Sequence, residues 1–271
     1  MTIRVRAPAS TANLGPGFDC AAAALDLWDE LDVEEDGAGE NADGLAAQAF
    51  ARLAPVEGRS FSYTARIPRG RGLGSSAAAI ALGLVAGAIA AGLDPAADEL
   101  LALGLDLEGH PDNLAAALAG GVCLTWDGNI ARIADDAPAE PVAVVPDAEV
   151  ETRAARAALP EQVPFADAAH TAAHAALLGA ALAGGSPELF AAAADDRLHE
   201  PYRAAKAPLL AEVRDPLPAD AVCATLSGSG PTVVVWARPG SSTTCAAELA
   251  ERFPDADVFP LSVSPSGAGP R

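Results

Sequence analysis

Hydrophobic and polar positions alternate in three short runs near the N-terminus. Ile3–Ala7, Leu27–Glu35 and Ser60–Ile67 each place apolar side chains at every second position. A period of two is typical of strands with one buried face. Between the first two runs, Ala9–Asp19 is rich in small residues and turn formers, which predicts a loop. The pattern therefore predicts three strands in this part of the chain.

A long uncharged run follows the third strand. Gly72–Leu93 consists mostly of Ala, Gly and Ser, and Gly83 and Gly87 form the GxxxG spacing of membrane helices. Large apolar residues are few, and no second span accompanies this one. A helix that is apolar all round is also typical of the interior of a soluble protein. We therefore predict a buried central helix, and a membrane span is the weaker alternative.

The remaining chain mixes helical and strand patterns. Helices are predicted over 45–53, 95–107, 152–159, 167–183, 187–198, 206–213 and 243–252, and strands over 122–126, 142–145, 221–226, 232–236 and 258–261. The polar stretch 127–141 predicts a boundary between two domains, residues 1–135 and 136–271. The tail SVSPSGAGPR is expected to be frayed. The mixture predicts an α+β fold with helices on sheets in both halves.

Composition limits the partners. The 271 residues include 17 Lys+Arg and 37 Asp+Glu, a formal net charge of −20. Such acidity repels nucleic acid and anionic membrane surfaces, so an anionic ligand needs a binding site whose local potential is positive. The cysteines, Cys20, Cys123, Cys223 and Cys245, form no CxxC pair and are expected to be reduced thiols rather than zinc ligands. The N-terminus has no apolar segment of a secretory signal, so we expect a cytoplasmic protein.

The strongest chemical signal is the segment PRGRGLGSS at Pro68–Ser76, between a predicted strand and the long helix. Its glycines permit positive φ and let several backbone N–H groups approach one anion. Ser75 and Ser76 lie where the helix begins, where hydroxyls and the helix dipole favour a phosphate or a metal. The loop lacks the GK[ST] of a Walker A motif. The alternative is a glycine-rich turn with a serine cap.

This segment resembles a known phosphate-binding loop. Residues 68–77, PRGRGLGSSA, are similar to the P-x-G-x-G-L-G-S-S-A loop of the GHMP kinases. PASTANLGPGFD at 8–19 resembles the first motif of that superfamily in its homoserine kinase form, and LSGSGPT at 226–232 resembles the third. EGHPDN at 108–113 is similar to a further homoserine kinase signature. All of these motifs occur in the order found in the family.

The resemblance implies a fold and an activity. The fold would be that of the GHMP kinases, with a ribosomal-protein-S5-domain-2-like ATP-binding domain at 1–135, a ferredoxin-like domain at 136–271 and the site between them. The activity would be Mg²⁺-dependent transfer of the ATP γ-phosphoryl group to the side-chain hydroxyl of L-homoserine, a step of threonine biosynthesis. A homodimer is expected, because dimers are common in the family. The alternatives are a GHMP kinase for mevalonate or a sugar, and an inactive nucleotide-binding homologue.

The resemblance also implies roles for individual residues. ATP phosphates are expected at Pro68, Arg69, Gly70, Arg71, Gly72, Leu73, Gly74, Ser75, Ser76 and Ala77. L-Homoserine is expected at Asn13, Asp19, His110, Asn113, Arg156, Arg203, Gly228 and Gly230. In this assignment Asp19 meets the ammonium group, and the two arginines bind the carboxylate. Mg²⁺ is expected at Ser76 and Glu108, and the catalytic set is Ser76, Glu108, Asp112 and Asn113.

Three of these assignments have alternatives. Arg153 competes with Arg156, and Arg156 and Arg203 could each instead be a solvated surface charge. Asp112 is the nearest candidate base, but phosphoryl transfer can also proceed by positioning and charge stabilisation alone. Asp43-Gly44-Leu45 departs from the family's usual entry to the helix beside the adenine, which leaves the nucleotide preference open.

Overall fold

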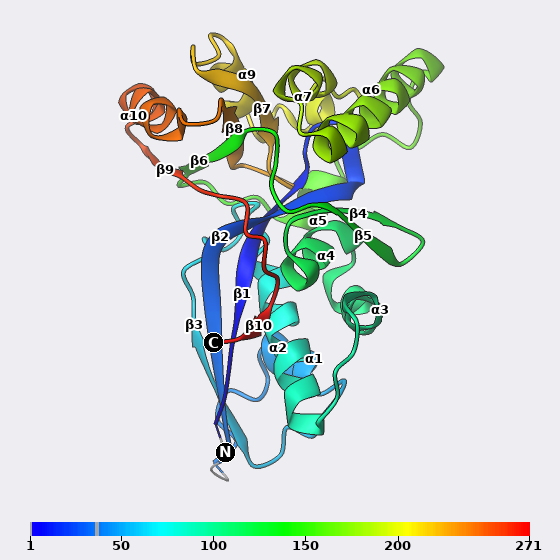
Figure 1. Ribbon diagram of the computed structural model, residues 1–271, viewed down its shortest axis with the longest axis vertical. Coiled ribbons are helices and arrows are strands. Elements are labelled where there is room, and N and C mark those ends of the chain that lie inside the picture. Colours follow the sequence, from blue (N-terminus) through cyan, green and yellow to red (C-terminus); the bar gives the residue numbers. More distant parts are fainter. Residues whose placement is uncertain (1, 36–37) are drawn as a thin grey trace.

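The structure, a computed structural model, describes residues 2–35 and 38–271, and its two antiparallel sheets lie at opposite ends of an elongated molecule (Figure 1). The first sheet has the order β10-β1-β2-β4-β5, with β3 paired to β2, and the second has the order β7-β8-β6-β9. The strands are β1 (Thr2–Asn13), β2 (Gly17–Glu35), β3 (Arg59–Thr64), β4 (Val122–Trp126), β5 (Asn129–Ala134), β6 (Glu140–Pro146), β7 (Ala221–Leu226), β8 (Val233–Ala237), β9 (Ala256–Pro260) and β10 (Gly269–Pro270).

The helices divide between the two sheets. Four of them, α1 (Leu45–Phe50), α2 (Ser75–Ala91), α3 (Ala97–Glu108) and α4 (Pro111–Ala119), lie on one side of β1–β3 (Figure 1). The others are α5 (Thr152–Arg156), α6 (Phe165–Gly184), α7 (Pro187–Ala193), α8 (Glu200–Arg203), α9 (Leu209–Arg214) and α10 (Ser242–Arg252). The expected α+β mixture is present in both halves.

The central helix α2 is buried among protein, as its composition predicted. Its glycines are contact positions: a Cβ on Gly83 would lie 2.0 Å from the Ala46 carbonyl oxygen, and one on Gly87 would lie 2.8 Å from that of Phe50. The GxxxG spacing therefore lets α1 pack closely on α2. Ile80, Leu82 and Leu84 of α2 are buried in the hydrophobic core between the first sheet and helices α1–α4, which we call the first core. Among the described residues, no helix is long and apolar enough to cross a membrane.

The predicted loop over 9–19 is wrong for most of its length. β1 continues to Asn13 and β2 begins at Gly17, so the two strands form a hairpin with a turn of only a few residues. Ala12, Ala22 and Ala24 are fully buried against Ala116 of α4. Because both faces of this hairpin are covered, its residues do not alternate in polarity, and the period-two signal is lost.

The C-terminal tail is also ordered, contrary to the expected fraying. It runs from β9, the edge strand of the second sheet, back to the first sheet, where β10 pairs with β1 (Figure 1). The Ala268 N–H donates to the Ala117 carbonyl at 2.7 Å, and the Arg271 N–H donates to that of Arg4 at 3.0 Å. Backbone pairing of this kind needs no apolar side chains, so the polar composition of the tail did not reveal it.

Two further segments differ from the prediction. The polar stretch 127–141 contains the strand β5, which pairs with β4 and completes the first sheet. The helix predicted over 187–198 ends at Ala193, and a short helix, α8, follows at Glu200–Arg203. The division into residues 1–135 and 136–271 stays a prediction; all strands of the second sheet follow Ala134.

Candidate active site

Three motif segments, distant in sequence, are joined by hydrogen bonds. The Ser10 N–H donates to the Leu73 carbonyl at 3.1 Å, and the Gly228 N–H donates to the Ala12 carbonyl at 3.2 Å. Ser227 Oγ lies 2.7 Å from the Gly72 carbonyl oxygen. The segments 8–19, 68–77 and 226–232 therefore form one structural unit.

The glycines of the Pro68–Ser76 loop are required by this packing. Gly72 has φ +86°, and a Cβ there would lie 2.3 Å from the Ser227 carbonyl oxygen. Gly74 has φ +69° and is the N-cap of α2, and its Cβ would lie 2.1 Å from Ser10 Oγ. Both positions exclude any side chain. The chain therefore enters α2 with Ser75 and Ser76 in the first turn and the helix N-terminus facing the loop.

Two cavities adjoin this helix N-terminus and share Ser75 and Ser76. We call the first the central cavity; it is lined by Asn13, Asp19, Gly70, Gly72, Gly74, Ser75, Ser76, Glu108, His110, Asp112, Asn113, Val150, Thr152, Arg156, Arg203, Gly228 and Ser229. We call the second the side cavity; it is lined by Leu31, Asn41, Asp43, Gly44, Leu45, Ala46, Ala47, Phe61, Tyr63, Arg69, Ser75, Ser76 and Ala79. The side cavity is the more apolar of the two in its residues, and the central cavity contains most of the charged groups.

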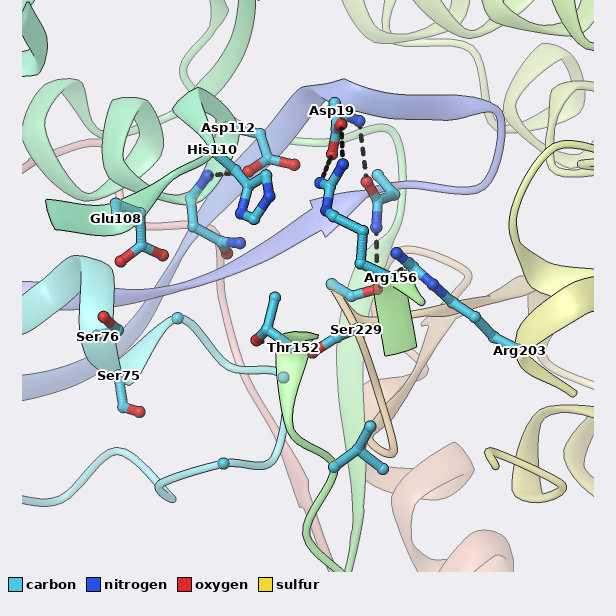
Figure 2. Close-up of a pocket in the computed structure, with 17 residues that line it drawn as sticks. Asp19, Ser75, Ser76, Glu108, His110, Asp112, Thr152, Arg156, Arg203 and Ser229 are labelled. Carbon is cyan, nitrogen blue, oxygen red and sulfur yellow. Dashed lines mark hydrogen bonds and ion pairs between the residues drawn. The ribbon is translucent and has the colours of Figure 1, made fainter. Parts of the chain in front are cut away.

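The central cavity has two chemically different ends. In Figure 2, Ser75, Ser76 and Glu108 lie at one end, and Arg156 and Arg203 lie at the other. His110 and Asp112 lie between the two ends in the same view. A ligand spanning the cavity would meet hydroxyls, a carboxylate and a helix N-terminus on one side, and a pair of guanidinium groups on the other.

Glu108, the last residue of α3, is suited to a cation. Its Oε2 is buried and has no hydrogen-bond partner among the described residues. Burial raises the pKa of this carboxyl to about 7, partly offset by a hydrogen bond with Ser76. An unpartnered carboxylate oxygen beside a serine hydroxyl is an appropriate donor set for Mg²⁺, which takes oxygen ligands and keeps several waters or phosphates. These two residues therefore fit the expected metal.

Asp112 and Asn113 stand in the first turn of α4, directly after His110 and Pro111. Asp112 is only 3% exposed, and burial raises its pKa to about 6 although the Asn113 N–H donates to its Oδ1 at 2.7 Å. Ser10 Oγ donates to Asn113 Oδ1 at 2.8 Å, which fixes the amide and leaves its NH₂ group for the cavity. Burial and the Arg156 charge lower the pKa of His110.

The charged end is built on the tip of the β1–β2 hairpin, where Asn13 ends β1 and Asp19 lies near the start of β2. Asp19 has φ +57°, a conformation uncommon outside glycine, and its N–H donates to Asn13 Oδ1 at 3.1 Å. Its carboxylate accepts two hydrogen bonds from Arg156, at 2.9 and 2.6 Å. Asn13 Nδ2 and Arg203 Nη1 both donate to the Gly228 carbonyl, at 2.9 and 3.0 Å. Burial lowers the pKa of Arg203, and the nearby Arg156 charge lowers it further.

Arg203 is also held by residues that lie outside the cavity lining. The Asp196 carboxylate accepts the backbone N–H groups of His199 and Glu200, at 2.8 and 2.9 Å, and so caps α8. His199 Nδ1 lies 3.3 Å from Arg203 Nη1, and its Nε2 lies 2.8 Å from the Gly15 carbonyl oxygen. Because an arginine can only donate, Nε2 carries the proton and the ring is neutral. Burial lowers the pKa of His199 to about 4, consistent with this form.

The expected site residues do not all reach the central cavity. Leu73 and Ala77 are buried in the first core, and Gly230 is buried against Leu226. Arg69 lines the side cavity, whereas Arg71 donates to the Pro146 carbonyl. Pro68 lines neither cavity.

The two arginines that competed for the carboxylate, Arg153 and Arg156, differ in their exposure. Arg153 is exposed and lies outside the lining, whereas Arg156 reaches the cavity. Reasoning from sequence missed Val150, Thr152 and Ser229 as lining residues. Two of them had a signal: Thr152 lies one helical turn before Arg156, and Ser229 belongs to the third glycine motif.

The comparisons with known proteins agree with this geometry. Residues 42–121 match the family model of the GHMP kinases N terminal domain. The fold and the three joined glycine motifs are those of a GHMP kinase. The homoserine kinase of Clavibacter michiganensis subsp. michiganensis is 41% identical over 92% of this chain and 87% of its own length. The homoserine kinase of Streptomyces avermitilis is 42% identical over 89% of this chain and 87% of its own.

Solved structures give the same result. The crystal structure of homoserine kinase from Cytophaga hutchinsonii superimposes with a TM-score of 0.88 at 26% identity, and the match covers 99% of this chain and 96% of that one. The chain belongs to the homoserine kinases of the GHMP kinase family.

Proposed function

We propose that this chain transfers the γ-phosphoryl group of ATP to the side-chain hydroxyl of L-homoserine, giving ADP and O-phospho-L-homoserine, in threonine biosynthesis. The observation that carries the proposal is the polarity of the central cavity, with Ser76 and Glu108 at one end and Asp19, Arg156 and Arg203 at the other. A zwitterionic alcohol matches this arrangement, because its charges can bind at one end while its hydroxyl extends toward the other.

ATP is proposed to bind with its phosphates at the N-terminus of α2. The left-handed glycines of the loop and the helix dipole supply a local positive potential within a chain of net charge −20. The side cavity, which includes Asp43, Leu45 and Tyr63, is proposed to take the base and ribose. Ser75 and Ser76 line both cavities, so the γ-phosphate would reach the central cavity past them.

Mg²⁺ is proposed to bind between Ser76 and Glu108. When bound, it supplies positive charge that neutralises phosphate oxygens. The unpartnered Glu108 Oε2 supports this choice. The protein's own contribution is to hold this carboxylate, at the C-terminal end of α3, beside the N-terminus of α2.

L-Homoserine is proposed to bind with its ammonium group at Asp19 and its carboxylate at Arg156 and Arg203. The forked guanidinium groups favour a planar carboxylate, and the side chain would extend toward the end of the cavity that holds Ser76 and Glu108. Its hydroxyl would lie among His110, Asp112 and Asn113, which occupy the middle of the cavity. Their role is to orient the hydroxyl for in-line attack, because a loose phosphoryl transition state demands little proton removal.

Product analysis tests the proposal. Purified protein incubated with Mg²⁺, ATP and L-homoserine should yield one new phosphomonoester with the mass of O-phosphohomoserine, together with equimolar ADP. ADP formed without any phosphorylated amino acid would contradict the proposal, because it would indicate hydrolysis alone. Phosphorylation of mevalonate or galactose in place of L-homoserine would identify a different kinase of the same superfamily.

The expected homodimer remains a proposal that rests on the family resemblance. Light scattering of the purified protein gives its mass directly, and twice the 27.1 kDa of one chain is the expected result.

A further inference from the structure

A second group of potential ligand side chains lies away from the central cavity, between α6 and the segment that follows α7. His170 and His174 are one turn apart on α6, and Asp195 lies two residues after the end of α7. His170 Nε2 is 2.9 Å from Asp195 Oδ2, and the two imidazole rings stack with centroids 4.0 Å apart. One ligand atom from each of the three residues lies within 4.8 Å of the others.

The histidine nitrogens are oriented for a ligand. His174 Nδ1 lies 3.3 Å from the Ala193 carbonyl oxygen, which can only accept, so Nδ1 carries the proton and the Nε2 lone pair is free. Metal-binding histidines are commonly oriented by such a carbonyl. His170 Nε2 is buried and, although close to Asp195, has no hydrogen-bond partner among the described residues.

We propose that His170, His174 and Asp195 bind a divalent transition-metal ion of the zinc class. Two imidazoles and one carboxylate are donors that Zn²⁺, Co²⁺ and Ni²⁺ accept, and a water completes a tetrahedral shell. Ligand atoms around tetrahedral zinc lie about 3.4 Å apart, which follows from bond lengths near 2.1 Å. The Asp195 side chain is 61% exposed and can rotate to reach this spacing. The chain's net charge of −20 also attracts cations.

The proposed ion would connect two parts of the second half. Asp195 precedes Asp196, whose carboxylate caps the helix that carries Arg203. An ion held by α6 and Asp195 would therefore fasten this capping segment to α6. Because the site is incomplete in an unfolded chain, binding would stabilise the folded protein.

Cobalt titration of the full-length protein tests the site. The titration is followed by visible absorption with Mg²⁺ in excess, so that Glu108 does not compete for the added ion. We expect one Co²⁺ per chain with the spectrum of nitrogen and oxygen ligands. We also expect a Zn²⁺-dependent rise in Tm. Asp195→Asn and His170→Gln should each weaken binding by about a hundredfold or more, since loss of an outer partner alone costs about 10- to 100-fold.

Glu188→Gln is the matched control, because it removes an exposed carboxylate from α7 outside the cluster and should leave binding unchanged. Asp195→Asn alters a largely exposed side chain, so its Tm without metal should equal that of the parent protein. The proposal is overturned by unchanged Co²⁺ affinity in both ligand variants, by absence of binding in the parent protein, or by a thiolate charge-transfer band that places the ion on cysteine.

Discussion

Asp19 and Arg156 form a bidentate ion pair, with Arg156 Nη1 2.9 Å from Asp19 Oδ2 and Nη2 2.6 Å from Oδ1. The two residues come from the start of β2 and from α5, so the pair joins these two elements across the cavity. In our account they bind opposite charges of one zwitterion. L-Homoserine would then replace one protein–protein ion pair with two protein–ligand ion pairs, so that neither Asp19 nor Arg156 is left without a partner of opposite charge.

Removal of either charge should weaken L-homoserine binding. Asp19→Asn and Arg156→Met should each raise KM for L-homoserine by roughly 10- to 100-fold, as expected for loss of a charged hydrogen bond worth about 1.5–3 kcal/mol. KM for ATP should change little, because both residues lie at the far end from Ser76. Steady-state kinetics with each substrate varied in turn provides the measurement.

Arg153→Met is the matched control for this prediction, since Arg153 is exposed on the same short helix. It should leave both KM values within about twofold of the parent protein, as for other exposed charges. Equal effects of Arg153→Met and Arg156→Met would remove Arg156 from the carboxylate site.

Ser76→Ala should depress kcat by about tenfold or more while the fold is preserved, because it removes a proposed oxygen ligand without altering the helix N-cap at Gly74. The Mg²⁺ concentration needed for half-maximal rate should also rise. Circular dichroism and Tm serve as the controls for folding. An unchanged rate across the Mg²⁺ titration would refute the metal role of Ser76.

Glu108 should make the protein less stable as pH rises. Its pKa is raised to about 7 in the folded state by burial, whereas the ordinary value is 4.5. Between these values the unfolded chain has lost a proton that the folded chain retains, so the free energy of unfolding falls as pH rises through this window. Below about pH 4 Glu108 is protonated in both states, and the stability that is lost at higher pH is fully present.

The variant Glu108→Gln isolates that contribution. Its free energy of unfolding should exceed that of the parent at pH 8 by up to a few kcal/mol, at about 1.4 kcal/mol per pKa unit, and the difference should vanish near pH 4. Added Mg²⁺ should stabilise the parent and not the variant. Urea unfolding at several pH values measures this, and a pH-independent difference would contradict the assigned cause.

Asp112 distinguishes positioning from base catalysis. Its Oδ1 already accepts the Asn113 N–H, and its pKa of about 6 leaves it ionised at neutral pH. We expect Asp112→Asn to retain kcat within about tenfold, since removal of a true general base costs about 10²- to 10⁴-fold. A larger loss that is accompanied by disappearance of the acidic limb of the pH–rate profile would make Asp112 the base.

Sequence reasoning succeeded where a residue type and its spacing impose the geometry. Gly72 and Gly74 were predicted from a motif that needs left-handed backbone, and each has positive φ with no room for a Cβ. The central helix was recognised from its even distribution of small apolar residues. Its glycines then proved to be contacts with α1 rather than with another membrane helix.

The missed features depend on contacts between segments far apart in the chain. The β1–β2 hairpin was predicted as a loop because alanines buried on both faces leave no alternation. The C-terminal strand pairs through its backbone, so its side chains show no pattern from which the strand could be predicted. Ser10 fixes Asn113 across 103 residues of sequence. His199 lies only four residues before Arg203, but it is itself held by the Gly15 carbonyl across 184 residues, so neither role could be assigned from local pattern.

The most direct test of the central claim is a comparison of kcat/KM for ADP release with L-homoserine, L-serine, mevalonate and galactose at saturating Mg²⁺ and ATP. We expect L-homoserine to be preferred and L-serine to be a poorer substrate, because its hydroxyl is one carbon closer to the charged groups. We expect mevalonate and galactose to give no turnover above background. Turnover of mevalonate or galactose without turnover of L-homoserine would contradict the account.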